Sequence, residues 1–206
     1  MAHLTGQDRE RIAAAVAAVE ARTSCEFVAI VAPEASFYWS VRLGAPILAS
    51  ALISLVWLLW GPTPLTATGL LQLQTVTFAV VGAAFFWTPL LRAVTPKSLF
   101  HERAAMLAQA QFHASGVAGT KGRTGVLLFV SLCEHHVEII ADRGVAEHMG
   151  PDDWQAVIDG FVAKVRQGRL VDAFEYATAA CGDLLAEKFP RRDDDQNELP
   201  DAPTAL

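Results

Sequence analysis

The stretch of the chain between Arg42 and Arg92 contains no charged side chain. It consists of two apolar spans, at about 41–60 and 69–91, which are separated by a turn-rich Gly-Pro-Thr-Pro connection. Each span reaches the roughly 20 residues that a helix needs to cross about 30 Å of hydrocarbon. The sequence therefore predicts a transmembrane helical hairpin over residues 41–91.

Aromatic and basic side chains lie at the ends of both spans. Trp and Tyr favour the headgroup level of a bilayer. Two buried helices of a soluble core are the alternative interpretation, but such helices rarely lack every charge over so long a stretch and carry aromatic residues at both ends. The residues expected at the membrane interfaces are Trp39, Arg42, Trp57, Trp60, Trp87 and Arg92.

The distribution of basic residues predicts the orientation of the hairpin. Arg42, Arg92 and Lys97 lie on the outer sides of the two spans, whereas the connection over 61–74 has no Lys or Arg. By the positive-inside rule, both termini and the soluble part of the chain then face the cytoplasm. We expect a protein integral to the inner, cytoplasmic membrane of a bacterium, in contact with the lipid bilayer.

Composition limits what else the chain contains. With 206 residues, of which 52% are hydrophobic, it has room for the hairpin and one compact soluble domain. The formal net charge of −6, without a basic patch, gives no electrostatic support for a nucleic-acid partner. Cys25, Cys133 and Cys181 are widely spaced, odd in number and lie in or beside apolar segments. This pattern predicts reduced thiols instead of a disulfide framework or a metal knuckle.

The soluble part is predicted to form a discontinuous α/β domain from residues 4–32 and 95–190. Its strands are apolar throughout, and such strands need cover on both faces, which amphipathic helices can supply. The expected fold is a small mixed sheet sandwiched by helices, with the membrane hairpin inserted. Residues 191–206 are polar, acidic and proline-bearing, which predicts a disordered tail. Strands are expected at 26–32, 126–132 and 137–140, and helices at about 5–22, 95–114, 151–167 and 170–189.

Several segments of this domain resemble the TPM domain family, named for its thylakoid, periplasmic and membrane occurrence. The resemblance is carried by 124–132 (TGVLLFVSL), by 137–144 (VEIIADRG) and by the helix from Trp154. Residues 19–28 and 168–173 are similar to the family's passage into its first strand and its link into the last helix. The better-known members place the domain outside the cytoplasm, often before a C-terminal membrane helix, whereas here the hairpin lies inside the domain.

The resemblance implies phosphatase activity and divalent-metal binding, which have been proposed for some members, and a role in photosystem repair, proposed for plant members. After the third strand, many members have a glycine-rich turn, often with Tyr-Gly. This chain has Asp142, Arg143 and Gly144 there, and a complete catalytic set does not map onto it. Its catalytic residues are therefore unassigned, and whether it is an enzyme stays open.

Phosphoryl hydrolysis requires a metal ion or a cationic clamp, and clustered carboxylates to hold the metal. Asp142 follows the third predicted strand, where ligands of α/β sheets commonly lie, and Asp152 and Asp153 are close in sequence. These three acids are the candidate ligands of a divalent cation. Their alternative roles are structural, since Asp is favoured in turns and at helix starts. The segment 134–136 (EHH) is a second candidate source of metal ligands.

Two functional hypotheses follow. The first is a membrane-anchored, cytoplasm-facing module that binds a membrane or cytoplasmic protein partner and serves membrane or envelope maintenance. The alternative is a divalent-metal-dependent, phosphatase-like hydrolase that uses Asp142 with Asp152 or Asp153. Small residues at 44–46 and 82–84 allow helices to approach closely, which is compatible with packing inside the hairpin or with a homo-oligomer.

Overall fold

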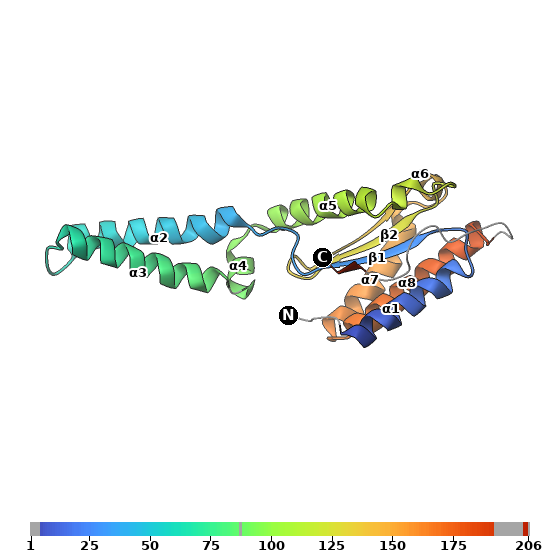
Figure 1. Cartoon of the computed structure of the whole chain (residues 1–206), viewed down its shortest axis with the longest axis horizontal. Coiled ribbons are helices and arrows are strands. Elements are labelled where there is room, and N and C mark those ends of the chain that lie inside the picture. The colour runs from blue at the N-terminus through green and yellow to red at the C-terminus, as the bar shows by residue number, and fades with distance from the viewer. Residues whose placement is uncertain (1–4, 87, 192–203, 206) are drawn as a thin grey trace. The chain divides into compact units, whose positions relative to one another are not determined.

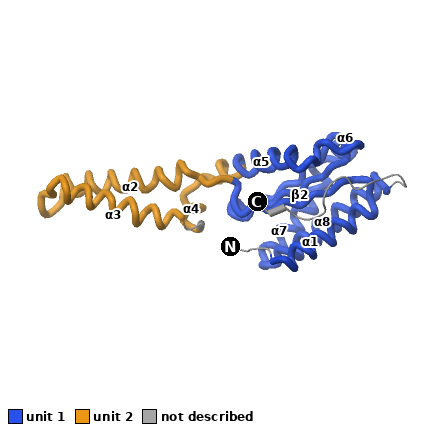
Figure 2. The backbone as a smooth tube through the Cα atoms, in the orientation of Figure 1, with its two compact units in different colours: residues 1–35, 102–206 blue, residues 36–101 orange. Residues whose placement is uncertain are grey.

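The computed structural model describes residues 5–86, 88–191 and 204–205 (Figure 1). The chain divides into two compact units (Figure 2). One unit contains residues 1–35 and 102–206, and the other contains residues 36–101. Of the ranges predicted for the α/β domain, 5–32 and 102–190 lie in the first unit, whereas 95–101 lie in the second unit with the predicted hairpin.

The first unit is built on a mixed sheet with the strand order β3-β2-β1-β4. Strands β1 and β2 are parallel, with Phe27 opposite Val126, and β2 and β3 are antiparallel. The short β4 is parallel to β1. The predicted α/β class and its small mixed sheet are thus confirmed. The strands are β1 (Phe27–Ala32), β2 (Val126–Ser131), β3 (His136–Ala141) and β4 (Thr204–Ala205).

Helices cover both faces of this sheet. Alternate residues of β1 and β2, such as Phe27 and Leu128, pack into a core with α1, α7 and α8. The residues between them, such as Ile30 and Phe129, pack on the other face with Phe112 of α5. Burial on both faces explains why every residue of β1 and β2 is apolar or small. The helices are α1 (Gly6–Glu20), α5 (Lys97–Ala114), η1 (Val117–Gly119), α6 (Arg143–Ala146), α7 (Pro151–Arg166) and α8 (Leu170–Lys188).

Local capping determines where two of these helices begin. The Thr5 hydroxyl accepts from the N–H of Asp8 at 3.2 Å, and the Asp8 carboxylate accepts from the N–H of Thr5 at 2.9 Å. This reciprocal pair starts α1. The hydrogen bonds that the Asp8 carboxylate accepts from the N–H and the hydroxyl of Thr5 lower the pKa of Asp8. In α7, Pro151 occupies the first turn and Asp153 accepts from the N–H of Gly150 at 2.8 Å. Such caps typically stabilise a helix by about 1 kcal/mol.

The second unit contains α2 (Trp39–Trp60), α3 (Ala67–Phe85) and α4 (Thr88–Val94). Helices α2 and α3 pack against each other. Gly82 lies at their contact, because a Cβ there would be 3.8 Å from Cγ of Pro46. Small residues therefore serve packing within this pair of helices, which is one of the two roles compatible with the sequence.

The second apolar span differs from the prediction in one respect. A single helix was expected over 69–91, but α3 ends at Phe85 and α4 begins at Thr88. Pro89 has no N–H for the carbonyl of Phe85, and its ring crowds that carbonyl, so a continuous helix is broken here.

The predicted disordered tail, 191–206, lies mostly outside the described residues. Within it, Thr204 and Ala205 form β4 and pair with Ile30 and Val31 of β1.

Candidate functional site

Asp142 is the N-cap residue of α6. Its Oδ1 atom accepts from the N–H of Arg143 at 2.7 Å, and its own N–H donates to the carbonyl of Gly125 at 2.8 Å. The residue is only 7% exposed. Its second carboxylate oxygen, Oδ2, is buried and has no hydrogen-bond partner among the described residues. Capping therefore explains one oxygen of this carboxylate and leaves the other buried without a described partner.

Asp152 and Asp153 lie in the first turn of α7, and both are exposed. Asp153 caps that helix through Gly150, and both charges lie at the positive end of the helix dipole. Within the part of the chain that the structure describes, no three or more His, Cys, Asp or Glu side chains form a group that could hold a metal ion. Asp142, Asp152 and Asp153 are thus not brought together as such a group, and the divalent-cation site stays a prediction.

The glycine at position 144 has a packing reason. The N–H of Gly144 donates to the carbonyl of Arg123 at 2.9 Å. A Cβ at Gly144 would lie 2.6 Å from that oxygen and 2.8 Å from the carbonyl oxygen of Gly122. Only glycine allows the two backbones to approach this closely. The segment 142–144 is therefore joined to the glycine-rich connection before β2.

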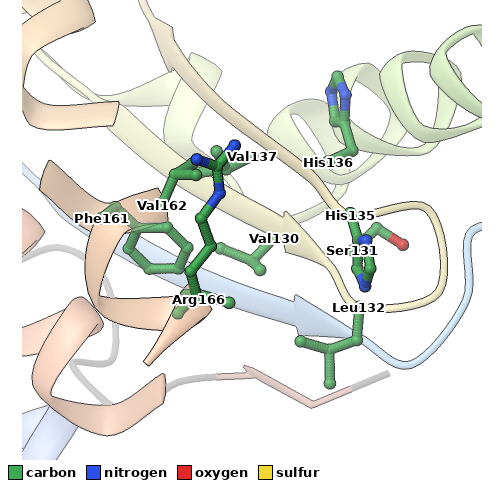
Figure 3. A pocket seen from close by; sticks show the side chains of 10 residues that line it. Val130, Ser131, Leu132, His135, His136, Val137, Phe161, Val162 and Arg166 are labelled. Carbon is green, nitrogen blue, oxygen red and sulfur yellow. The ribbon is translucent and has the colours of Figure 1, made fainter. Parts of the chain in front are cut away.

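A cavity of about 330 Å³ lies at the opposite end of the sheet, between the β2–β3 hairpin and the end of α7 (Figure 3). Its lining is mostly apolar, and the cationic and titratable groups beside that apolar surface are Arg166, His135 and His136. Arg166 is exposed and forms no hydrogen bond or ion pair with another described residue. A lining of this kind suits an apolar group that carries a negative charge or a hydrogen-bond acceptor at one end. The lining residues are Val130, Ser131, Leu132, His135, His136, Val137, Phe161, Val162, Val165 and Arg166.

The histidines of the predicted second metal set do not act together. Figure 3 shows the ring of His136 pointing away from the other labelled side chains. This ring lies 3.0 Å from Oε2 of Glu138, the next residue on the same face of β3. His135 has a positive φ of 51° in the hairpin turn. The turn thus directs the two neighbouring rings to different surroundings.

Glu134 has a structural role that the sequence did not indicate. Although it is in a hairpin turn, it is buried, and its Oε1 accepts from the N–H of Ala35 at 2.9 Å. Its Oε2 accepts from the hydroxyl of Ser131. The N–H of Cys133 also donates to the carbonyl of Pro33 at 2.9 Å. These bonds hold the end of β1 against the hairpin beside the cavity.

The three cysteines are free and buried. Burial raises the pKa of the Cys181 thiol to about 12, so this group is protonated at neutral pH. The thiol of Cys181 therefore offers neither a nucleophile nor a metal ligand.

The fold and the candidate sites define a class of protein: a mixed α/β sandwich with a pair of long apolar helices inserted after its first strand. Residues 90–184 match the model of the TPM domain family. This match confirms the resemblance to the TPM domain family over a segment that includes α5, β2, β3, α7 and most of α8.

Among solved structures, the NMR structure of the BA42 protein from the psychrophilic bacterium Bizionia argentinensis is similar. The similarity covers 100% of this chain and 97% of that chain, with a TM-score of 0.62 and 16% sequence identity. At this level of identity, the likeness concerns the fold alone. No curated protein matches the sequence.

Proposed function

We propose that this protein is a membrane-anchored TPM-domain module, in which α2 and α3 cross the bilayer and the α/β unit binds a protein partner on the cytoplasmic side. The observation that carries the proposal is the exposure of apolar side chains on α2 and α3. Leu58 and Trp60, for example, are 73% and 76% exposed.

Helices α2 and α3 resemble neither the core helices of a soluble protein nor a signal sequence. Core helices are mostly buried, but only 11% of the most apolar stretch of α2 and 6% of that of α3 is buried. A signal sequence lies near the N-terminus, whereas α1 and β1 precede these helices. Leaving a large apolar surface in water is unfavourable, by about 25 cal/mol for each Å². Contact with lipid removes this cost for both helices.

Residues at the start of α2 support an interfacial position for this end of the helix. The guanidinium of Arg42 lies 4.2 Å from the ring centroid of Phe37 and 5.6 Å from that of Phe86. Trp39 is exposed beside them, with its ring 4.3 Å from that of Phe37. Aromatic rings and a cation at the end of an apolar helix are typical of the headgroup region.

The other residues proposed for the membrane interfaces lie at the far end of the helix pair, on α4 or outside the described residues. At the far end of the helix pair, the indole N–H of Trp57 donates to the carbonyl of Thr63 at 3.2 Å, and Trp60 is exposed. Arg92 lies in the last turn of α4. Trp87 lies outside the described residues. These positions are consistent with two interfaces, one at each end of α2 and α3.

A binding role is favoured over hydrolysis by the character of the cavity. Its surface is mostly apolar, with one unpaired exposed cation, Arg166, among the described residues. The acids on which a hydrolase would depend have separate structural roles: Asp142 caps α6, Asp153 caps α7, and Asp152 lies in the first turn of α7. The cavity is therefore better suited to holding an apolar group of a partner than to activating water.

The anchor and its orientation are tested by carbonate extraction and by labelling with a membrane-impermeant maleimide in intact cells. One variant carries Thr63→Cys, between α2 and α3, and the matched control carries Ala163→Cys on the exposed face of α7. We expect the chain to remain in the membrane pellet. Thr63→Cys should be labelled in intact cells, and Ala163→Cys only after the membrane is opened.

The two readouts separate two parts of the proposal. Release of the chain by carbonate would show that α2 and α3 are not an anchor. Retention with the opposite labelling pattern would leave the anchor in place and overturn the cytoplasmic orientation.

A further inference from the structure

The cavity between the β2–β3 hairpin and the end of α7 is large enough for a small ligand (Figure 3). Its volume of about 330 Å³ lies at the lower end of the roughly 300–1,000 Å³ that is typical of small-molecule sites. A space of this size holds one small molecule, and the side chains that line it indicate the chemistry of that molecule.

The apolar part of the lining is continuous with the core of the α/β unit. Val130 and Phe161 are buried and belong to the core cluster itself. Val137, Val162 and Val165 also line the cavity, but they are only partly buried and pack against that cluster. A ligand with an apolar chain would cover these three valines and remove their remaining apolar surface from water, which is favourable.

Ring packing and hydrogen bonds fix the wall of the cavity. The ring centroid of Phe161 lies 5.2 Å from that of Phe174, in an edge-to-face contact. In the hairpin turn, the buried carboxylate of Glu134 accepts from the N–H of Ala35 and from the hydroxyl of Ser131. The hydroxyl proton of Ser131 is thereby used within the protein. The wall is therefore preformed, which lowers the cost of binding a ligand.

The charged and titratable groups of the lining indicate the head group of the ligand. They are Arg166, His135 and His136, and no acidic side chain of the described residues lines the cavity. In the whole chain, 22 acidic residues outnumber 16 basic ones, so this lining has a local excess of positive charge. Arg166 is the permanent cation among the three groups.

Arg166 differs from several other arginines of the α/β unit in its surroundings. Arg11, Arg22 and Arg143 each form an ion pair with an Asp or Glu side chain. Arg166 is exposed and has no such partner among the described residues, and its side chain extends from the end of α7 toward Val137 (Figure 3). A guanidinium group can bind both oxygens of a carboxylate in one plane. The donors of Arg166 are therefore available to a carboxylate that enters the cavity.

We propose that this cavity binds a small apolar carboxylate, whose chain lies against Val130, Phe161 and the three partly buried valines and whose head group pairs with Arg166. A carboxylate is favoured over a phosphate head group because it carries one charge, whereas a phosphate monoester carries up to about two at neutral pH and the lining has one permanent cation. This inference rests on the binding role proposed for the cavity and names the class of its ligand. It does not depend on the membrane anchor.

The test is photo-cross-linking of the full chain, in detergent, with a medium-chain fatty acid that carries a diazirine in its chain. Mass spectrometry of peptides from the cross-linked protein locates the label. We expect label on the segments of β2, β3 and α7 that line the cavity. Label on α2 and α3 measures the partition of the probe into the detergent around these apolar helices and serves as the internal reference.

Unlabelled competitors separate the contributions of the chain and the head group. An excess of octanoate should remove most of the label from the cavity. Octylamine has the same chain with a positive charge, and acetate has the same head group without the chain, so neither should compete. Octyl phosphate should compete no better than octanoate, because Arg166 offers a single permanent charge.

Variants of α7 test the two parts of the site. Arg166→Gln should lower the labelling of the cavity about fivefold, since an exposed ion pair makes a modest contribution to binding. The matched control is Lys164→Gln, which removes a positive charge from the same helical turn but from a side chain that packs on the ring of Tyr176. This control should be labelled like the wild type. Val162→Phe fills the cavity and should prevent labelling, and a thermal melt checks that each variant is folded.

Labelling confined to α2 and α3 would overturn the inference. Equal competition by octylamine and octanoate would also overturn it, because the charge of the head group would then have no effect. Equal labelling of the wild type and Arg166→Gln would exclude Arg166 from the site, and stronger competition by octyl phosphate than by octanoate would overturn the choice of a carboxylate. A chain that fails these tests but stays in the membrane pellet after carbonate extraction keeps its anchor and loses only the ligand proposed for the cavity.

Discussion

Asp142 caps a helix with one carboxylate oxygen, whereas the burial of its other oxygen has no structural explanation. Its Oδ1 caps α6, as expected of an Asp that follows a strand, but its Oδ2 is buried without a hydrogen-bond partner among the described residues. Burying a carboxylate oxygen without a partner is costly. A cation bound at Oδ2 would offset this cost, which keeps the predicted divalent site testable at the level of one residue.

An Asp142→Asn variant separates the two roles. Asparagine keeps an oxygen to cap α6 but replaces the negative charge needed to hold a divalent ion. We expect millimolar Ca²⁺ or Mg²⁺ to raise the melting temperature of the wild-type chain by a few degrees and to leave the variant unchanged. Thermal melts of both proteins with and without each ion provide the measurement. A wild-type protein that melts at the same temperature in every ion would remove the metal site and, with it, the hydrolase alternative.

Among the elements, α1 and α8 form a helix pair with both buried and exposed contacts. The contact lies within one buried cluster, which includes Val16 and Val19 of α1 and Cys181 and Leu185 of α8. On the exposed side, Arg11 forms a bidentate contact with Glu175, with both N···O distances at 2.8 Å, and it also reaches Asp172 at 3.1 Å. These hydrogen bonds raise the pKa of Arg11. The contact between the two helices thus has a buried apolar part, here called the α1–α8 seam, and an exposed border of charged side chains.

Burial of Cys181 in this seam predicts a dependence of stability on alkaline pH. Desolvation raises the thiol pKa from 9.0 to about 12, so the unfolded chain loses this proton first as the pH rises. The stabilisation is therefore complete below about pH 9 and is lost between pH 9 and 12, by up to about 1 kcal/mol for each pH unit. We expect the melting temperature of wild type to fall more between pH 9 and 11 than that of Cys181→Ala.

The matched control is Cys133→Ala, which removes another thiol from outside the α1–α8 seam. This variant should keep the wild-type pH profile. In addition, iodoacetamide at pH 8 should not modify Cys181 in the folded protein. Rapid modification of Cys181, or identical pH profiles for wild type and Cys181→Ala, would contradict the assigned burial.

At the scale of the whole molecule, the unit of α2, α3 and α4 is inserted between β1 and α5, within the sequence of the α/β unit. The core of the α/β unit is formed from residues on both sides of the insertion, including Phe27 of β1 and Leu128 of β2. A domain with its own core tolerates an insertion at the surface if the core does not depend on it. The α/β unit is therefore expected to fold without α2, α3 and α4.

Replacing residues 37–96 by a flexible Gly-Ser linker tests this independence. We expect a protein that remains in the supernatant after high-speed centrifugation, with a mixed helix and strand signal in circular dichroism and cooperative unfolding. Its melting temperature should lie within about 5 °C of the value for the α/β unit in the full chain. A shortened chain that aggregates or melts without cooperativity would show that the inserted unit is needed for folding.

Local patterns in the sequence predicted the elements because their causes are local. The apolar runs of β1 and β2, the Thr5 cap of α1 and the proline start of α7 each depend on neighbours within a few residues. The sequence also contained the reason for the break after Phe85, since Pro89 cannot continue a helix, but the length of the apolar span concealed it. The stretch without charged side chains between Arg42 and Arg92 can be read directly from the sequence, without any knowledge of packing.

The tertiary structure decided which distant groups meet. It buried Glu134 against Ala35, joined Gly144 to the backbone of Arg123, and formed the cavity between the β2–β3 hairpin and α7. It also placed Thr204 and Ala205 beside Ile30 and Val31, at one edge of the sheet. These contacts depend on how elements pack across long separations in the chain, and no local periodicity records that. The sequence by itself therefore determined the long helices, the strands β1 to β3 and the apolar pair, whereas packing determined the cavity and the pairing of β4 with β1.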